Sequence, residues 1–141
     1  MLESRAGLVD LVVADLYCGS GAMGIEALSR GAKKVYFYDS DTASLGAARA
    51  NLEPLGLEGE THFIRAVLPL WQPPSDLDLV LADPPYGPFD LASVLVGVRA
   101  HRVIIENDRL MEAPAGWSVT KTKRYGTTLV TMLEPVEDGD E

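Results

Sequence analysis

The sequence predicts an α/β fold with a largely parallel sheet, helices on both of its faces and an antiparallel hairpin at the end. Two observations support this prediction. Short runs of β-branched and other apolar residues alternate with helix-like stretches along most of the chain. Such alternation is typical of βαβ units, in which the strands run parallel. The last two strand-like runs are separated only by a turn, which favours an antiparallel pair.

The first half of the chain supplies the first predicted elements. Residues 11–16 form a continuous apolar run, as in a buried parallel strand, and residues 22–30 follow as a helix with one apolar face. Residues 35–39 are rich in β-forming side chains. Thr42 is a plausible N-cap for a helix that runs from residue 43 to about residue 55.

The second half of the chain continues the pattern. A strand over 78–82 cannot extend further, because two prolines follow it and proline donates no ladder hydrogen bond. A helix is expected over 91–98. The remaining predicted strands span residues 61–65, 102–106, 117–123 and 127–133.

Length and composition place the chain among ordinary one-domain proteins. It has 141 residues, of which 47% are hydrophobic. It contains no apolar run of about 20 residues that would span a membrane and no basic-then-apolar leader, so we expect a cytoplasmic protein. The single cysteine, Cys18, suits a reducing compartment and is interpreted as a packing residue. The net charge of −9 argues against tight nonspecific binding of nucleic acid.

Chemically useful residues follow the predicted strands, where ligands of such sheets bind. Residues 19–24 fit the pattern G-x-G-x-x-G between a strand and a helix, which lets the backbone approach a ligand. Asp39 follows the second strand and can accept both hydroxyls of a ribose. This pair fits NAD as well as other adenosine cofactors. Asp41 is equally compatible with a cap of the next helix.

The discriminating motif is Asp83-Pro84-Pro85-Tyr86, after the strand at 78–82. The prolines fix the backbone and leave carbonyl groups as acceptors, and Asp83 adds a carboxylate acceptor. Tyr86 adds a flat aromatic face. Two acceptors and a stacking ring are what the exocyclic amine of a flat base requires.

These residues resemble a known family. D-P-P-Y is a form of the motif of amino-group methyltransferases that use S-adenosylmethionine, and Asp15-x-Tyr17-x-Gly19-x-Gly21 looks like their cofactor loop. The stretch G-x-E-A-L-S-R-G-A at residues 24–32 and K-R-Y-G-T-T at residues 123–128 are similar to the RsmD-like 16S rRNA guanine-N2 methyltransferases. The resemblance covers roughly residues 9–135. It implies a class I, Rossmann-like methyltransferase fold: a three-layer sandwich with a seven-stranded, mostly parallel sheet.

The resemblance also implies roles for individual residues. Catalysis and base binding are assigned to Asp83, Pro84, Pro85 and Tyr86, with the target amine hydrogen-bonded to Asp83 and to the Pro84 carbonyl. Asp15 is expected to hold the amino group of the cofactor, directly or indirectly, and Asp39 its ribose hydroxyls. The full set of expected cofactor-binding residues is Asp15, Tyr17, Gly19, Ser20, Gly21, Asp39, Ser40 and Ala66. No metal is expected, since His62 and His101 lie in no ligand spacing.

Two departures from the family pattern concern the cofactor and the RNA. Arg65 stands where relatives carry Asp or Asn for the adenine amino group, and an arginine cannot accept that hydrogen bond. The basic segment that precedes the first strand in relatives is not found in this sequence. Two basic groups are candidates for contact with RNA. Lys121, Lys123 and Arg124 are equally compatible with an ordinary solvated face, and for Arg30, Lys33 and Lys34 the solvated face is the favoured interpretation.

We therefore expect a methyltransferase domain over residues 1–135 and an acidic disordered tail over 136–141. The expected partner is 16S rRNA or the assembling small ribosomal subunit, and the expected state is a monomer without a membrane partner. Three alternatives stay open: adenine-N6 methylation of DNA, a nicotinamide-dependent dehydrogenase, and a methyltransferase fold without catalysis.

Overall fold

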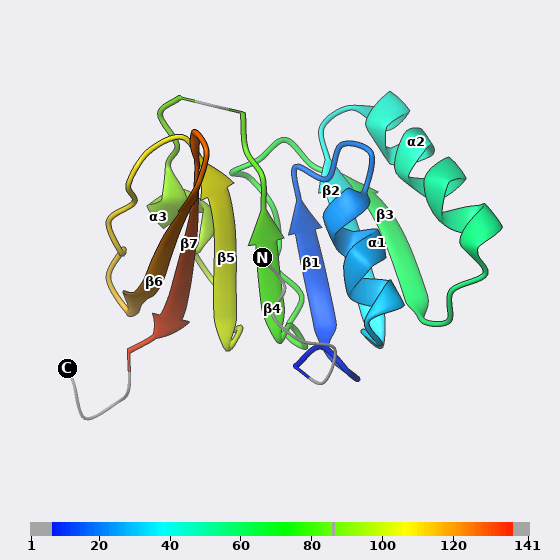
Figure 1. The fold of residues 1–141 in the computed structure, drawn as a ribbon, viewed down its shortest axis with the longest axis horizontal. Coiled ribbons are helices and arrows are strands. Elements are labelled where there is room, and N and C mark those ends of the chain that lie inside the picture. Colours follow the sequence, from blue (N-terminus) through cyan, green and yellow to red (C-terminus); the bar gives the residue numbers. More distant parts are fainter. Residues whose placement is uncertain (1–6, 86, 137–141) are drawn as a thin grey trace.

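The computed structural model describes residues 7–85 and 87–136 and contains one seven-stranded sheet in the order β3-β2-β1-β4-β5-β7-β6 (Figure 1). The first five strands pair in parallel, and β7 pairs antiparallel with β5 and with β6. The predicted fold class is therefore confirmed. The strands are β1 (Val12–Leu16), β2 (Lys34–Asp39), β3 (Glu60–Arg65), β4 (Leu79–Ala82), β5 (Arg102–Asn107), β6 (Trp117–Tyr125) and β7 (Thr128–Pro135).

The parallel strands end level with one another. Leu16 of β1 lies beside Tyr38 of β2 and beside Ala82 of β4, and Ala82 lies beside Ile105 of β5. We call this side of the sheet the carboxyl edge; it is the upper edge in Figure 1. The residue that follows each of these four therefore reaches the same edge of the sheet.

Helices cover both faces of the sheet. Helices α1 (Ala22–Ser29) and α2 (Thr42–Leu52) pack on one face, and the single turn of α3 (Leu91–Val94) packs on the other. Two predicted details of α2 are wrong. Its N-cap is Asp41, whose side chain accepts a hydrogen bond from the backbone of Ala43 at 2.9 Å, so Thr42 is the first helical residue.

Two helices also end earlier than predicted. Helix α2 ends at Leu52 and continues as the 3₁₀ turn η1 (Glu53–Leu55), because Pro54 cannot donate the next α-helical hydrogen bond. The helix expected over 91–98 ends after Val94. Its capping residue Leu95 leaves helical geometry, and Gly97 has a φ of 76°.

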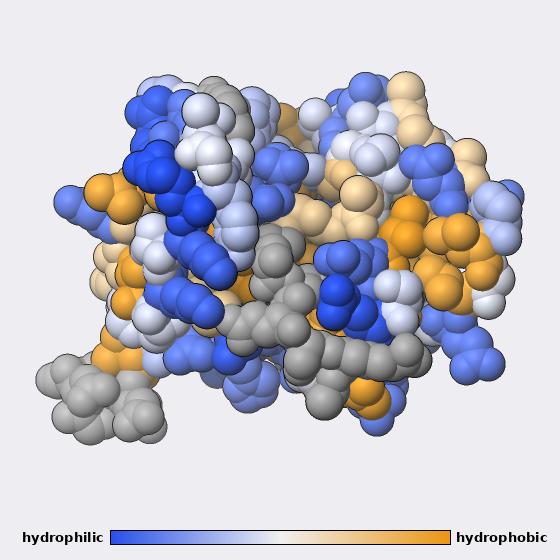
Figure 2. All heavy atoms as spheres, in the orientation of Figure 1, coloured by the Kyte–Doolittle hydropathy of each residue, from blue (hydrophilic) through white to orange (hydrophobic). Residues whose placement is uncertain are grey.

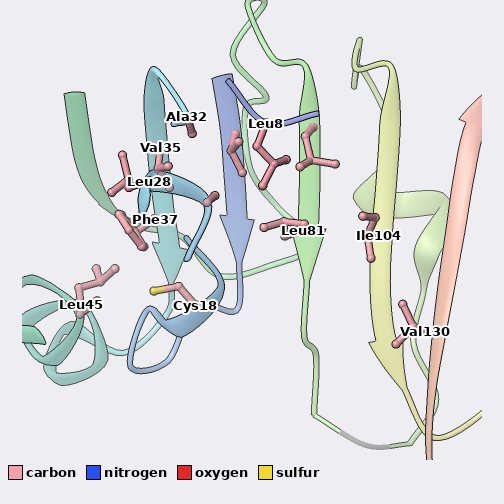
Figure 3. Packing of buried hydrophobic residues seen from close by; sticks show 14 residues of the cluster. Leu8, Cys18, Leu28, Ala32, Val35, Phe37, Leu45, Leu81, Ile104 and Val130 are labelled. Atoms are coloured by element: carbon pink, nitrogen blue, oxygen red, sulfur yellow. The ribbon is translucent and has the colours of Figure 1, made fainter. Parts of the chain in front are cut away.

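Each face of the sheet has its own core. Figure 3 shows the first cluster, in which Leu28 and Leu45 from the helices meet Val35, Phe37 and Leu81 from the strands. The second cluster covers the opposite face with residues of α3, its flanking loops and the alternate strand positions. A strand that is buried on both faces carries apolar residues at every position, as in Val12–Leu16 around Asp15.

The last strand in the sheet order, β6, is different. All its residues from Ser118 to Tyr125 are exposed, and it runs two residues beyond the predicted end at residue 123, so that the turn with β7 falls at Gly126 and Thr127. Hydrophilic side chains gather over it in Figure 2. Within the described part of the chain, no helix has both the length and the apolar character needed to cross a membrane.

Candidate active site at the carboxyl edge

The aligned strand ends bring the predicted site residues together. Tyr17, Asp39, Asp83 and Glu106 each follow directly on one of the four aligned residues of β1, β2, β4 and β5. Residues far apart in the sequence therefore form one row along the carboxyl edge. Three of them carry carboxylates, so this row is acidic.

The glycine-rich loop between β1 and α1 begins this row. Gly21 has a φ of 85°, a conformation that side chains disfavour, and caps α1. The backbone N–H of Gly19 donates to Asp39 Oδ2 at 2.9 Å, which joins the loop to the end of β2. The space that a Cβ at Gly19 would enter holds no atom within 4 Å. A ligand can therefore approach the backbone here.

Asp15 of β1 holds the end of this loop in place. Its side chain is buried, and its Oδ2 accepts a hydrogen bond of 2.9 Å from the backbone N–H of Gly24. Burial raises the pKa of Asp15 to about 7, and the nearby negative charges of Asp83 and Asp39 contribute to the increase. Only 1% of the surface of Asp15 is exposed, so its carboxylate is shielded from solvent and its described hydrogen bond is to the backbone of Gly24.

The end of β2 is held by its neighbours. Asp39 Oδ1 accepts from the backbone N–H of Asp41 at 3.0 Å, and the Ala66 N–H donates to the Asp39 carbonyl at 3.0 Å. Each carboxylate oxygen of Asp39 keeps a second lone pair for a ligand. Arg65 donates from Nε to the carbonyl of Ser40 at 3.0 Å, so this departure from the family pattern ties the end of β3 to the loop after β2.

The D-P-P segment follows β4 directly. Asp83 is exposed, Pro84 is buried and Pro85 is exposed. Surrounding protein removes part of the water around Asp83 and raises the pKa of this group above its ordinary value. Tyr86, the fourth residue of the motif, lies outside the described residues.

Three residues outside the predicted set support this segment. Phe89 contacts Tyr17 edge-to-face with ring centroids 5.8 Å apart, and Asp108 Oδ1 accepts from the Gly87 N–H at 3.4 Å. Glu106 is half-buried, and desolvation together with the negative charge of Asp83 raises its pKa. Phe89 lies three residues after Tyr86, which is the only sequence signal for its role. Glu106 stands at the end of a predicted strand and was identifiable on that ground.

Two further predicted features bear on chemistry. Cys18 is buried, and desolvation raises the pKa of its thiol to about 12, which fits a packing residue. Among residues 7–85 and 87–136, no group of three His, Cys, Asp or Glu side chains is arranged to hold a metal ion.

Comparison with known proteins identifies the family. Residues 1–134 match the family described as Conserved hypothetical protein 95. The chain is 29% identical over 135 residues to "Putative rRNA methyltransferase YlbH" of Bacillus subtilis, covering 85% of this chain and 73% of that protein. It is 30% identical over 127 residues to "Ribosomal RNA small subunit methyltransferase D" of Haemophilus influenzae, covering 79% of this chain and 65% of that protein.

Solved structures agree with this assignment. A crystal structure of a putative methylase from Haemophilus influenzae superposes with a TM-score of 0.75 at 27% identity, covering 94% of this chain and 91% of the other. TrmN from Thermus thermophilus superposes with a TM-score of 0.70 at 26% identity, covering 94% of this chain and 48% of the other. The chain belongs to the Conserved hypothetical protein 95 family, the RsmD-like methyltransferases whose motifs it carries.

Proposed function

We propose that the chain transfers a methyl group from S-adenosylmethionine to the exocyclic amine of a nucleobase, with guanine N2 in 16S rRNA as the target. One observation carries the proposal. The D-P-P segment stands at the carboxyl edge in line with the glycine-rich loop and with Asp39. A base acceptor site and a nucleoside cofactor site therefore adjoin each other, as direct transfer between the two requires.

The residues present fit this cofactor. Asp39 offers free lone pairs to ribose hydroxyls, and the open space beside Gly19 admits the methionine end. A hollow of about 390 Å³ opens beside Arg65 and Ala66 and is lined by Tyr38 and Ile64, which suits a flat heterocycle. Because the Arg65 side chain has no hydrogen-bond acceptor, backbone carbonyls and the side-chain carbonyl of Gln72, which also lines this hollow, are the candidates to accept from the adenine amine. When bound, S-adenosylmethionine supplies an electrophilic methyl group.

Asp83 and Pro84 act on the target amine. Its lone pair is delocalised into the base, and hydrogen bonds from its N–H groups to the Asp83 carboxylate and the Pro84 carbonyl make that lone pair more available. The N–C bond forms as the S–C bond breaks, and the amine then loses one proton. The raised pKa of Asp83 favours acceptance of that proton. The motif assigns to Tyr86, which lies outside the described residues, a stacking interaction with the base of about 1–3 kcal/mol.

The substrate assignment rests on the family and on the named relatives. The YlbH relative is named as acting on rRNA, and the Haemophilus relative as acting on the small-subunit rRNA. We infer the same partner for this chain, either as free 16S rRNA or in the assembling small subunit, in the cytoplasm. A base within an RNA helix must be unstacked to reach Asp83.

Transfer of tritiated methyl from S-adenosylmethionine to unmethylated small-subunit particles tests the proposal. The wild-type chain labels the RNA, and digestion to nucleosides yields N2-methylguanosine. Asp83→Ala abolishes labelling, whereas its affinity for S-adenosylhomocysteine in calorimetry stays within a few-fold of wild type. Glu58→Ala removes an exposed carboxylate beside Lys33 at the opposite edge of the sheet and keeps full activity.

The other outcomes separate the alternatives. Labelling that persists in Asp83→Ala refutes the role of Asp83. Recovery of N6-methyldeoxyadenosine from DNA identifies adenine N6 as the target amine. Cofactor binding without any labelled acceptor indicates a protein without catalysis, and calorimetric binding of NAD in place of S-adenosylhomocysteine indicates a dehydrogenase.

A further inference from the structure

The exposed edge strand β6 carries a basic cluster in an otherwise acidic chain. Lys121, Lys123 and Arg124 lie within four consecutive residues, whereas the whole chain has 12 basic and 21 acidic residues. No acidic residue occurs between Glu112 and Glu134. The local charge is therefore opposite to the net charge of −9, and we call these three residues the hairpin cations.

Lys123 and Arg124 differ in their partners from three basic residues elsewhere in the sheet and helices. Lys34 pairs with Asp76 at 2.9 Å, Arg30 with Glu26 at 3.8 Å and Arg102 with Glu134 at 3.2 Å. Within the described ranges, Lys123 and Arg124 form no ion pair, and Lys123 Nζ lies 5.2 Å from the ring centroid of Tyr125. Their charge is available to a ligand, and no carboxylate of the protein has to be displaced.

Register places these residues next to the active site. Glu106 of β5 lies opposite Val130 of β7, which lies opposite Lys123 of β6. Asp83 follows Ala82 and is level with Glu106. Three strand spacings of about 4.8 Å separate Lys123 from Asp83, or about 14 Å at the backbone. The β6–β7 turn also stands at the carboxyl edge (Figure 1).

We propose that the hairpin cations bind the phosphate backbone of the RNA strand that carries the target base, on the β6 side of Asp83. This inference rests on the proposed function, because it deepens it by assigning the surface that holds the RNA. Polyanion binding follows from charge complementarity: Lys and Arg displace counterions from phosphates, and the exposed ring of Tyr125 gives an unpaired base a stacking surface.

The position of β6 at the edge of the sheet also supports binding of the RNA phosphate backbone. Its outer backbone N–H groups face away from the sheet, since β6 is the last strand in the sheet order. Backbone N–H groups are ordinary donors to phosphate oxygens. Lys121 and Lys123 lie opposite Met132 and Val130, so both point to the face that carries α1, and hydrophilic side chains gather there in Figure 2.

The experiment measures binding of a 16S rRNA fragment to Lys123→Gln/Arg124→Gln at salt concentrations from 50 to 200 mM. Losing two single-strand phosphate contacts lowers the slope of log affinity against log salt by about 1.4. The wild-type chain then loses about seven-fold more affinity than the variant over this range. The affinity of the variant for S-adenosylhomocysteine stays unchanged, which shows an intact fold and cofactor site.

Arg30→Gln/Lys33→Gln is the matched control, because it removes two charges at the end of α1, at the opposite edge of the sheet. It keeps the wild-type salt slope. An unchanged slope in the hairpin variant, an equal reduction in the control or absence of RNA binding by the wild-type chain overturns the inference. A wild-type dimer that the hairpin variant dissociates also overturns it, since β6 then pairs with a second copy.

Methyl transfer distinguishes this failure from failure of the proposed function. If the wild-type chain methylates particles and the hairpin variant does so with the same KM, the function stands and the surface is wrong. If RNA binding depends on the hairpin cations but no methyl is transferred, the surface stands and the function is wrong.

Discussion

Replacement of Gly24 by alanine tests how closely the glycine-rich loop is packed. Gly24 lies in the first turn of α1, and a Cβ there would lie 2.9 Å from Phe37 Cζ, closer still to its Cε1, and 3.0 Å from Asp15 Oδ2. Phe37 cannot easily yield, because it is fully buried and stacks on Phe63 at 4.9 Å. The neighbouring Asp15 carboxylate is fixed by its hydrogen bond to the Gly24 backbone.

The expected magnitude follows from two opposing effects. Alanine in a helix interior gains about 0.5–1 kcal/mol over glycine, whereas one methyl group forced into a packed core costs about 1–3 kcal/mol. We therefore expect Gly24→Ala to lower the free energy of unfolding by about 1–2 kcal/mol, and the melting temperature by about 3 °C per kcal/mol. Gly46→Ala has only the first effect, since its Cβ meets nothing within 4 Å.

Urea unfolding of both variants at pH 7 measures the difference. Gly46→Ala becomes more stable than the wild-type protein, and Gly24→Ala becomes less stable, with unchanged m-values. Affinity for S-adenosylhomocysteine falls in Gly24→Ala alone, because the loop shifts. Equal stability of the two alanine variants would refute the packing that places Phe37 and Asp15 against this glycine.

Three further predictions concern single side chains. The pKa of Asp15 in the folded protein, about 7, lies above its ordinary value of 3.8, so the free energy of unfolding of the wild-type protein falls as pH rises through 7. In urea titrations from pH 5 to pH 8, the free energy of unfolding of Asp15→Asn therefore rises by roughly 3 kcal/mol relative to that of the wild-type protein. Thr131 is buried and its Oγ1 finds no hydrogen-bond partner among the described residues, so Thr131→Val raises the free energy of unfolding by about 1 kcal/mol. Arg65→Ala loses the hydrogen bond to Ser40 and weakens calorimetric binding of S-adenosylhomocysteine by about two- to ten-fold, without measurable loss of stability.

Each of these predictions has an outcome that contradicts it. A stability difference between Asp15→Asn and wild type that does not change with pH shows that Asp15 titrates normally. Thr122→Val, on the exposed strand opposite Thr131, is the control and stays within about 0.5 kcal/mol of wild type. Full cofactor affinity in Arg65→Ala shows that the loop after β2 needs no tie to β3.

The fold was predictable because its signals are local. Apolar runs such as Val12–Leu16 locate the buried strands, and the short turn at Gly126 favours antiparallel pairing of the two strands that it joins. What escaped prediction depends on competition between neighbours. Asp41 and Thr42 are both good N-caps, and only the three-dimensional geometry shows that the Asp41 side chain reaches the Ala43 N–H. The early end of α3 depends on packing as well as on Gly97.

The candidate site also has a part that the sequence predicts and a part that only the structure shows. Motif spacing locates Gly19, Asp39 and Asp83 at strand ends, and the parallel topology then brings them to one edge. The spacing of motifs along the sequence does not predict which side chains contact one another across the carboxyl edge. The Phe89–Tyr17 pair and the hydrogen bond from Arg65 to Ser40 join segments whose relative position the sequence does not specify. The burial that raises the pKa of Asp15 likewise follows from the whole sheet.

The sheet order has a consequence for how the protein is made. Strand β7 follows β6 in the sequence but lies between β5 and β6 in the sheet, so β6 leaves the ribosome before its neighbour in the sheet exists. Strand β5, which carries Glu106 beside Asp83, is likewise an open edge until Thr128–Pro135 has emerged. Premature termination before β7 therefore leaves the outer side of β5 and the whole of β6 unpaired, and such open strand edges promote aggregation.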